Sequence, residues 1–186
     1  MSAPAPMIAA LGAAVFVPML VEAARARRNE RQQTARGGVE PEGDVYDLMR
    51  VAYPASFVAM IGEGWMRGVP AAPLFAAGAA LFVAAKILKI WAIRSLGSFW
   101  TFRVIVVPGA RLVSAGPYRY VRHPNYIAVF GELLGAALMT GAAVAGPLAV
   151  ASFAFLIGRR IRVETRALAA AHCDEVAKSP KNHIPG

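Results

Sequence analysis

Five apolar segments follow one another along the chain, and the charged residues are gathered between them. The segments cover 7–21, about 51–61, 70–93 and the two halves of 126–157. Gly141 and Pro147 divide the last run, as expected for two helices joined by a tight turn. Spanning a bilayer takes about 20 helical residues, so the second segment is long enough only if it extends back through Tyr46. The pattern predicts five membrane helices.

Composition agrees with a membrane protein. The chain has 186 residues, of which 57% are hydrophobic and 17% charged, and its mean hydropathy is +0.48. Soluble domains are less apolar and carry about 25% charged residues. Within lipid every backbone polar group must be bonded internally, which favours helices here. We therefore expect one all-α integral membrane domain over 1–186, with no internal repeat.

The basic residues predict which ends of the helices face the cytoplasm, because arginine and lysine beside membrane segments concentrate on that side. They lie after the first, third and fifth segments, whereas the second loop has only Arg67 and the fourth has none. The residues concerned are Arg25, Arg27, Arg28, Arg31 and Arg36; Arg94, Arg103, Arg111, Arg119 and Arg122; and Arg159, Arg160, Arg162, Arg166, Lys178 and Lys181. This places the N-terminus outside and the C-terminus in the cytoplasm, in an inner membrane.

The net charge of +9 does not require a nucleic-acid partner. Long apolar runs break up the basic residues, so contact with anionic lipid headgroups accounts better for the charge.

The first apolar segment has no basic residue before it and several after it, the reverse of a signal peptide, which predicts a retained anchor. Within the third segment, Lys86 and Lys89 are expected to snorkel to the headgroups. Oligomeric state is left open.

The loop over 97–126 crowds polar, aromatic and basic residues directly before a membrane helix. Its last part reads Gly116, Pro117, Tyr118, Arg119, Tyr120, Val121, Arg122, His123, Pro124, Asn125, Tyr126. Such a segment can line a pocket at the mouth of a bundle, or it can be an interfacial belt with tyrosine and arginine at headgroup depth. Pro124 suits a first helical turn, where its missing N–H costs nothing.

Two acidic residues further on are candidates for function. Glu132 lies inside an apolar run, where a carboxyl group is costly and indicates either a functional role or a hydrogen-bonded structural one. Glu164 follows Arg160 by four residues on an expected helix, so the two share a face. That pair could be part of a site or an ordinary surface ion pair.

These motifs resemble the isoprenylcysteine carboxyl methyltransferase family, small membrane enzymes that use S-adenosylmethionine. The resemblance is carried by an Arg-His-Pro-x-Tyr motif with a downstream arginine and glutamate. Its segments are Arg28 to Arg31, Ala35 to Gly37, Leu96 to Thr101, Leu112 with Val113, Gly116 to Arg119, Arg122 to Tyr126, and Arg160 to Leu168. Sterol reductases carry a similar Arg-His-Pro-x-Tyr segment in a nicotinamide site.

The resemblance implies a cofactor pocket formed by about 97–126 and 158–186. Residue by residue, it implies that the cofactor contacts Ala110, Arg111, Leu112, Val113, Tyr118, His123, Pro124, Asn125, Tyr126 and Glu164. It also implies that Arg160 faces the methyl acceptor. A sulfonium cofactor with adenine, ribose and amino-acid groups suits aromatic faces, a carboxylate and hydrogen-bond donors. No metal is required.

The methyl acceptor is either a carboxylate, as in isoprenylcysteine, or a hydroxyl group. Arg160 could hold a carboxylate through a bidentate pair. A phenolic hydroxyl needs a general base, and His123 or Glu132 could serve. The chain has Ala128 where the family often has glycine, and Thr165 where the family often has a second acidic residue. An acidic residue at position 132 resembles a bacterial branch of the family whose members look like O-methyltransferases of phenolic or pyrone lipids.

The predicted function is therefore an S-adenosylmethionine-dependent O-methyltransferase whose lipophilic acceptor comes from the bilayer. Two alternatives differ in class. An NADPH-dependent sterol-type reductase would use the arginines on cofactor phosphates, and a non-catalytic membrane scaffold would keep the bundle without the chemistry.

Overall fold

The computed structural model describes residues 5–68, 70–110 and 113–178. In this part of the chain it has five α-helices, two short 3-10 turns and no strand. The helices are α1 (Ala5–Ala35), α2 (Tyr46–Arg67), α3 (Ala72–Leu96), α4 (Pro124–Thr140) and α5 (Ala145–Lys178), and the turns are η1 (Gly97–Phe99) and η2 (Gly116–Arg119). The all-α prediction is confirmed.

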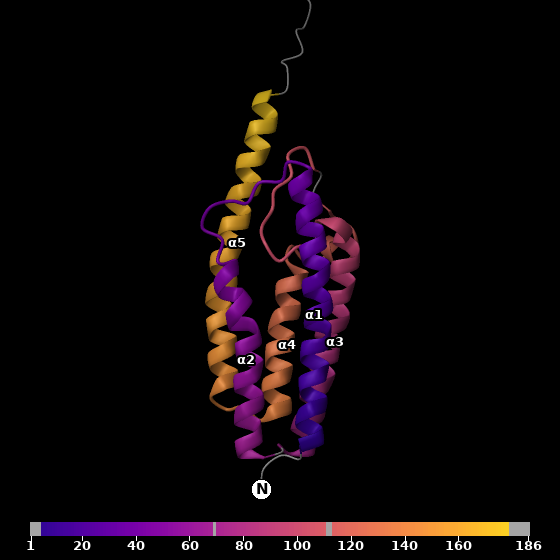
Figure 1. Cartoon of the computed structure of the whole chain (residues 1–186), viewed down its shortest axis with the longest axis vertical. Helices are drawn as coiled ribbons and strands as arrows, with labels where there is room; N and C mark the ends of the chain where they lie inside the picture. Colours follow the sequence, from indigo (N-terminus) through magenta and orange to yellow (C-terminus); the bar gives the residue numbers. More distant parts are fainter. Residues whose placement is uncertain (1–4, 69, 111–112, 179–186) are drawn as a thin grey trace, which may run out of the picture.

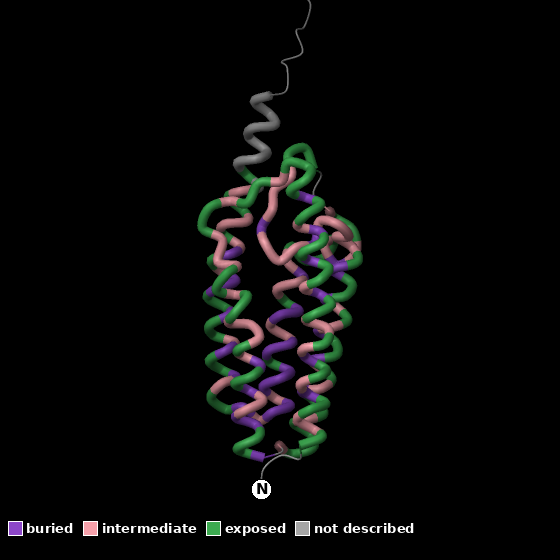
Figure 2. Tube along the Cα trace, in the orientation of Figure 1, coloured by how far each residue is buried: buried purple, intermediate pink, exposed green. Residues whose placement is uncertain are grey.

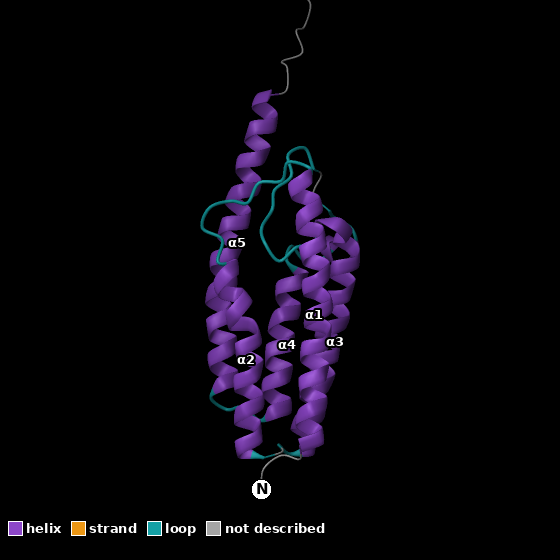
Figure 3. Cartoon of the chain, viewed as in Figure 1, coloured by secondary structure: helices purple, strands orange, loops and turns teal. Residues whose placement is uncertain are grey.

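The helices run up and down as one elongated bundle (Figure 1). The α1–α2 connection, the long loop between α3 and α4, and the last turns of α5 lie at one end, whereas the start of α1 lies at the other (Figure 3). All three arginine-rich segments therefore gather at one end of the bundle. This arrangement agrees with the predicted alternation of the loops, and which side of a membrane that end faces stays a prediction.

Among the described residues, two segments are long enough and contain an 18-residue stretch apolar enough to cross a membrane, namely α1 and Ala72–Phe99, and the mean hydropathies of these stretches are 2.0 and 1.8. Large apolar side chains also point outward from several helices, among them Leu20, Val21, Val83, Ile87, Leu148 and Phe155. Water would solvate so many of them poorly, and acyl chains would not. The molecule is a helical membrane bundle, and the spanning of α2, α4 and α5 stays a prediction.

The helix boundaries agree with several local signals. α2 begins at Tyr46 and α4 at Pro124. α4 ends because Gly141 adopts a left-handed conformation (φ 64°, ψ 26°) in which its N–H bonds back to the helix. The basic segment after the first apolar run, however, is not a loop, because α1 continues to Ala35. The basic segment after the last run continues α5 to Lys178, which agrees with the helix expected for Arg160 and Glu164.

α4 is the central helix of the bundle, and Figure 2 shows buried residues concentrated along it. It packs closely on α3 through glycines at Gly78, Gly131 and Gly135. A Cβ atom on Gly135 would lie 2.7 Å from the Phe82 nitrogen and 2.8 Å from the Gly78 carbonyl oxygen. Small residues let helix backbones approach in lipid, where apolar association has little hydrophobic drive. On the other side of α4, Phe57, Leu133 and Phe153 are fully buried.

Replacing Gly135 with alanine is expected to destabilise the bundle by about 2 kcal/mol, since the new methyl group would meet backbone atoms that cannot move aside cheaply. Thermal unfolding of the detergent-purified protein, followed by circular dichroism, measures the change. Gly62→Ala is the matched control, because a Cβ there meets no atom within 4 Å. Equal melting temperatures for the two variants would contradict close α3–α4 packing.

Candidate functional site

Hydrogen bonds from α1 hold the beginning of the α3–α4 loop. The side-chain amide of Asn29 donates to the carbonyl oxygens of Gly97 (3.0 Å) and Trp100 (2.7 Å), and that of Gln33 donates to Ser98 (3.0 Å). Both amides are buried, so losing these bonds would leave polar groups unsatisfied. The loop is therefore fixed to the part of α1 that extends beyond its apolar segment.

The Arg-His-Pro-Asn-Tyr motif forms the start of α4. Pro124 is buried in the first turn, as predicted. The rings of His123 and Tyr126 stack at 5.3 Å between centroids with 25° between their planes. Asn125 Oδ1 accepts a long hydrogen bond from the indole N–H of Trp100 (3.5 Å). One end of α4 thus presents an imidazole and a phenol side by side.

α5 brings Arg160 and Glu164 to these two rings. The hydroxyl of Tyr126 donates to Glu164 Oε2 (3.0 Å) and accepts from Arg160 Nε (3.1 Å). His123 Nδ1 lies 3.8 Å from the same Glu164 oxygen, which is beyond hydrogen-bond distance. The side chains of His123 and Glu164 are 21% and 30% exposed, so the cluster of His123, Tyr126, Arg160 and Glu164 opens to solvent on their side.

Arg160 is the buried member of this cluster, at 6% exposure. Nη1 lies 3.2 Å from Asp44 Oδ1, and Nη2 donates to the carbonyl oxygen of Phe102. All three guanidinium nitrogens therefore donate to protein acceptors. The surface ion pair considered for Arg160 and Glu164 is wrong, because both bond to Tyr126 and Arg160 is not at the surface.

Tyr118 in η2 lies near the cluster. Its partial burial, with a smaller contribution from the negative charge of Glu164, raises the pKa of Tyr118 above its ordinary value. A tyrosine is protonated at neutral pH already at its ordinary pKa, and the shift extends that range to higher pH, so the Tyr118 hydroxyl can donate a hydrogen bond. The predicted contact of Tyr118 with the cofactor stays a prediction.

The other predicted cofactor residues come from the middle of the loop. Val113 is half-buried, and Ala110 is exposed in a turn in which its N–H bonds to the Val107 carbonyl (3.1 Å). Arg111 and Leu112 lie outside the described residues. Their predicted contact with a cofactor stays a prediction.

Glu132 belongs to a different group, deeper in the bundle. It is fully buried and faces Lys86 Nζ (3.0 Å) and Lys89 Nζ (3.1 Å), while the hydroxyl of Tyr53 donates to it (2.5 Å). Glu22 completes the group, 3.2 Å from Lys86 and 2.9 Å from Lys89. We call these four charged residues the buried quartet. Its formal charges cancel, and its members come from α1, α3 and α4.

The snorkelling predicted for Lys86 and Lys89 is wrong. Lys89 is only 2% exposed, and both ammonium groups point into the bundle. Each ammonium group lies about 3 Å from two carboxylates. If the lysines extended to the distant headgroups instead, these carboxylates would be left as unpaired charges inside the bundle, which would be far costlier. The structural alternative for Glu132, a carboxyl group bonded to neighbouring helices, agrees with this arrangement, and its role as a general base stays a prediction.

Sequence reasoning missed Asp44, Glu22 and Tyr53. Glu22 offered a signal, since it is an acidic residue directly after an apolar run. Asp44 offered none, because it lies in a polar connection with other acidic residues, Glu40, Glu42 and Asp47. Tyr53 looked like any aromatic residue of an apolar segment.

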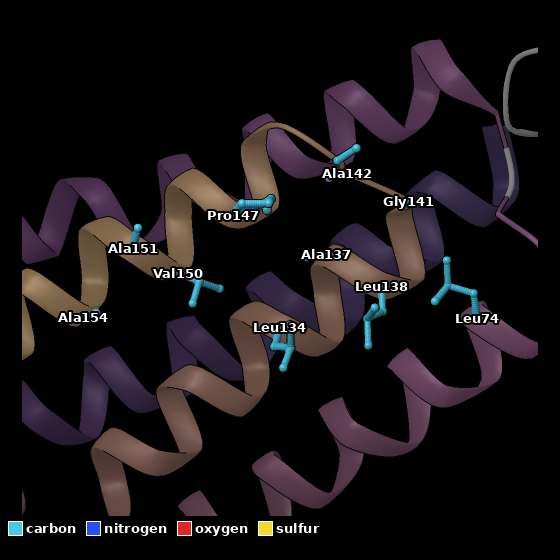
Figure 4. Close-up of a pocket in the computed structure, with 12 residues that line it drawn as sticks. Leu74, Leu134, Ala137, Leu138, Gly141, Ala142, Pro147, Val150, Ala151 and Ala154 are labelled. Atoms are coloured by element: carbon cyan, nitrogen blue, oxygen red, sulfur yellow. The ribbon is translucent and has the colours of Figure 1, made fainter.

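An apolar hollow of about 560 Å³ lies between α3, α4 and α5, near the turn that contains Gly141 (Figure 4). Leu134, Leu138 and Val150 line it together with small residues. It is at the opposite end of α4 from His123, so it is separate from the cluster of polar residues.

Comparisons with known proteins assign the family. The model of the isoprenylcysteine carboxyl methyltransferase family matches residues 78–170, which include His123, Tyr126, Arg160 and Glu164. The chain belongs to this family. Membership indicates a membrane methyltransferase and agrees with the resemblance carried by the Arg-His-Pro-Asn-Tyr motif.

Among similar proteins, this family member is 33% identical over 156 residues to the uncharacterized protein YpbQ of Bacillus subtilis, covering 84% of the chain and 93% of YpbQ. It is 24% identical over 142 residues to an uncharacterized protein of Haemophilus influenzae, covering 76% of the chain and 83% of that protein. No solved structure matches the chain.

Lys89→Met is expected to destabilise the protein by about 3 kcal/mol, because it leaves Glu22 and Glu132 buried with one ammonium group between them. Unfolding in detergent measures this loss. A second variant that also carries Glu132→Gln restores neutrality and should recover part of it. Ile90→Met, at an exposed neighbouring position, is the control, and an equally stable Lys89→Met protein would argue against a paired quartet.

Proposed function

We propose that this protein is an S-adenosylmethionine-dependent O-methyltransferase that acts on a lipophilic acceptor. The observation that carries the proposal is the meeting of His123 and Tyr126 from α4 with Arg160 and Glu164 from α5. In the sequence, Tyr126 is 34 positions from Arg160 and 38 positions from Glu164. They lie at the end of the bundle where the family's motif segments gather.

The chemistry of the cluster fits this cofactor. Glu164 Oε2 accepts a hydrogen bond from the Tyr126 hydroxyl, and in the described part of the chain Glu164 Oε1 receives no hydrogen bond. A partly exposed carboxylate oxygen suits ribose hydroxyls or an ammonium group. The stacked rings of His123 and Tyr126 and the phenol of Tyr118 offer aromatic surface to adenine or to a sulfonium cation. These residues would hold the cofactor, which supplies an electrophilic methyl group when bound.

The protein's part in methyl transfer is then to position the acceptor oxygen and exclude water. The oxygen–methyl bond forms as the sulfur–methyl bond breaks, and in-line geometry can supply much of the rate. A carboxylate acceptor needs no base. A hydroxyl acceptor loses a proton, and His123 is better placed than Glu132 to take it, since Glu132 is engaged by Lys86, Lys89 and Tyr53.

The charge balance of the cluster favours a hydroxyl acceptor over a carboxylate. Asp44 already compensates Arg160, and Glu164 adds a second negative charge. A carboxylate entering beside them would add a further negative charge, which the positive groups of the bound cofactor or a movement of Asp44 would have to offset, whereas a neutral hydroxyl would add none. An acceptor with an apolar tail could approach from the bilayer along the exposed apolar faces of the bundle, and the arginine distribution favours the cytoplasmic side for the cofactor.

The purified protein in detergent is expected to bind S-adenosylmethionine and its demethylated product, and Glu164→Ala or His123→Ala should weaken binding at least about tenfold by removing a polar contact. Isothermal titration calorimetry measures the affinity. Thr165→Ala, exposed next to Glu164, is the matched control. Binding of NADPH in place of S-adenosylmethionine would support the reductase, and binding of neither would remove the cofactor proposal.

Membranes containing the protein should transfer a labelled methyl group from S-adenosylmethionine to an extractable lipid, and Glu164→Ala membranes should not. Alkaline hydrolysis of the product then identifies the acceptor, because a methyl ester releases its label and a methyl ether keeps it. We expect the label to be retained. Release would favour a carboxylate acceptor, and absence of labelled lipid under conditions where S-adenosylmethionine binds would favour the non-catalytic scaffold.

A further inference from the structure

Asp44 connects the α1–α2 segment to the cluster on α4 and α5. Its side chain is 4% exposed. Oδ1 lies 3.2 Å from Arg160 Nη1, and Oδ2 accepts the backbone N–H of Val104 (3.1 Å). Each oxygen of this carboxylate thus has a partner, and the two partners come from α5 and from the α3–α4 loop.

We propose that Asp44 is a positioning residue of the methyltransferase site: it holds Arg160 so that Arg160 in turn fixes the hydroxyl of Tyr126 toward Glu164. The inference rests on the proposed function, since it names a further residue of the same site. Asp44 lies outside residues 78–170, the part that the family model matches. The segment before α2 would therefore contribute to a site otherwise built by the second half of the chain.

A chain of hydrogen bonds connects Asp44 to Glu164 through Arg160 and Tyr126. Arg160 Nε donates to the Tyr126 hydroxyl (3.1 Å), and that hydroxyl donates to Glu164 Oε2 (3.0 Å). A phenol that accepts on one side and donates on the other has its O–H direction fixed. The planar guanidinium holds this direction only while its other nitrogens are anchored. Asp44 supplies a charged anchor, and the Phe102 carbonyl supplies a neutral one.

Charge compensation explains why the anchor is an acid. Arg160 is buried, and a buried guanidinium without a counter-ion is costly. Among the described residues, Asp44 is the carboxylate in direct contact with Arg160, and Glu164 reaches Arg160 through Tyr126. An asparagine at position 44 would keep the shape and lose the charge. Arg160 would then turn toward solvent or toward Glu164, and Tyr126 would lose its fixed direction.

The alternative is that Asp44 occupies the place of an acceptor carboxylate, which would displace Asp44 from Arg160 when it binds. Its second bond, to the Val104 N–H, and its burial favour a permanent contact. Neighbouring contacts reinforce the segment: Arg103 binds Glu40 through Nη1 (2.8 and 2.9 Å), and Val39 pairs with Val106. Releasing Asp44 would disturb these contacts between the two loops as well.

The test compares Asp44→Asn with Asp47→Asn in the full chain, purified in detergent. Asp47 is the matched control because its side chain is 76% exposed three positions further on. The first readout is labelling of individual arginines by a dicarbonyl reagent, mapped by mass spectrometry. Arg159 and Arg162, both exposed, serve as internal references for Arg160. The second readout is affinity for S-adenosylmethionine by calorimetry, alone and combined with Tyr126→Phe.

We expect Asp44→Asn to expose Arg160 to labelling and to weaken S-adenosylmethionine binding about tenfold, the effect of losing one charged hydrogen bond. Tyr126→Phe should then add little, because both changes break the same chain of contacts. Asp47→Asn should match the wild type in both readouts. This combination separates positioning from general loss of structure.

Unchanged labelling of Arg160 in Asp44→Asn would overturn the proposal, as would exposure of Arg160 with wild-type affinity, which would make the contact purely structural. Fully additive effects with Tyr126→Phe would overturn the route through Tyr126. If the wild type binds no S-adenosylmethionine, the proposed function fails and the positioning role falls with it, while labelling still decides whether Asp44 holds Arg160.

Discussion

Burying charge inside an apolar bundle is possible only with a counter-charge nearby, and this constraint organises the whole molecule. An isolated ammonium or carboxylate away from water costs several kcal/mol even after relaxation. The bundle meets the constraint twice. Glu22, Lys86, Lys89 and Glu132 cancel one another in its interior, and Asp44 compensates Arg160 near its polar end. Both groups link segments that are distant in sequence.

The two groups differ in what they leave open. The buried quartet is enclosed between α1, α3 and α4, and Tyr53 from α2 adds a hydrogen bond, so it ties four helices into one arrangement. The cluster at the polar end keeps His123 and Glu164 partly exposed while Arg160 and Asp44 are buried. A rigid base with an accessible carboxylate and imidazole suits the small charged cofactor that we propose.

Close packing of α3 on α4 determines where the cluster lies. Gly78, Gly131 and Gly135 bring the two backbones together, which fixes the height of α4 and therefore of His123 and Tyr126 at its first turn. α5 returns antiparallel after the turn at Gly141 and carries Arg160 and Glu164 to the same level. Helix packing in the apolar part of the molecule thus sets distances in its polar part.

Much of this arrangement could be predicted from local sequence. Apolar segments of helical length, Gly141 between two of them and Pro124 at a helix start are signals that act within a few residues. The placement of Arg160 and Glu164 on one helix face followed from helical periodicity. His123 and Tyr126 could be named because their motif is shared with a known family, and the structure brings them to Glu164.

The sequence by itself therefore determined the all-α bundle and the order of its helices, and its resemblance to a known family named the residues of α4 and α5 that meet at the polar end. Tertiary structure alone decided which charges pair. Asp44 and Arg160 are 116 positions apart, and Lys89 and Glu132 are 43 apart. No local pattern marks such partners, because the energy of a buried ion pair depends on distances that exist only after the helices have packed.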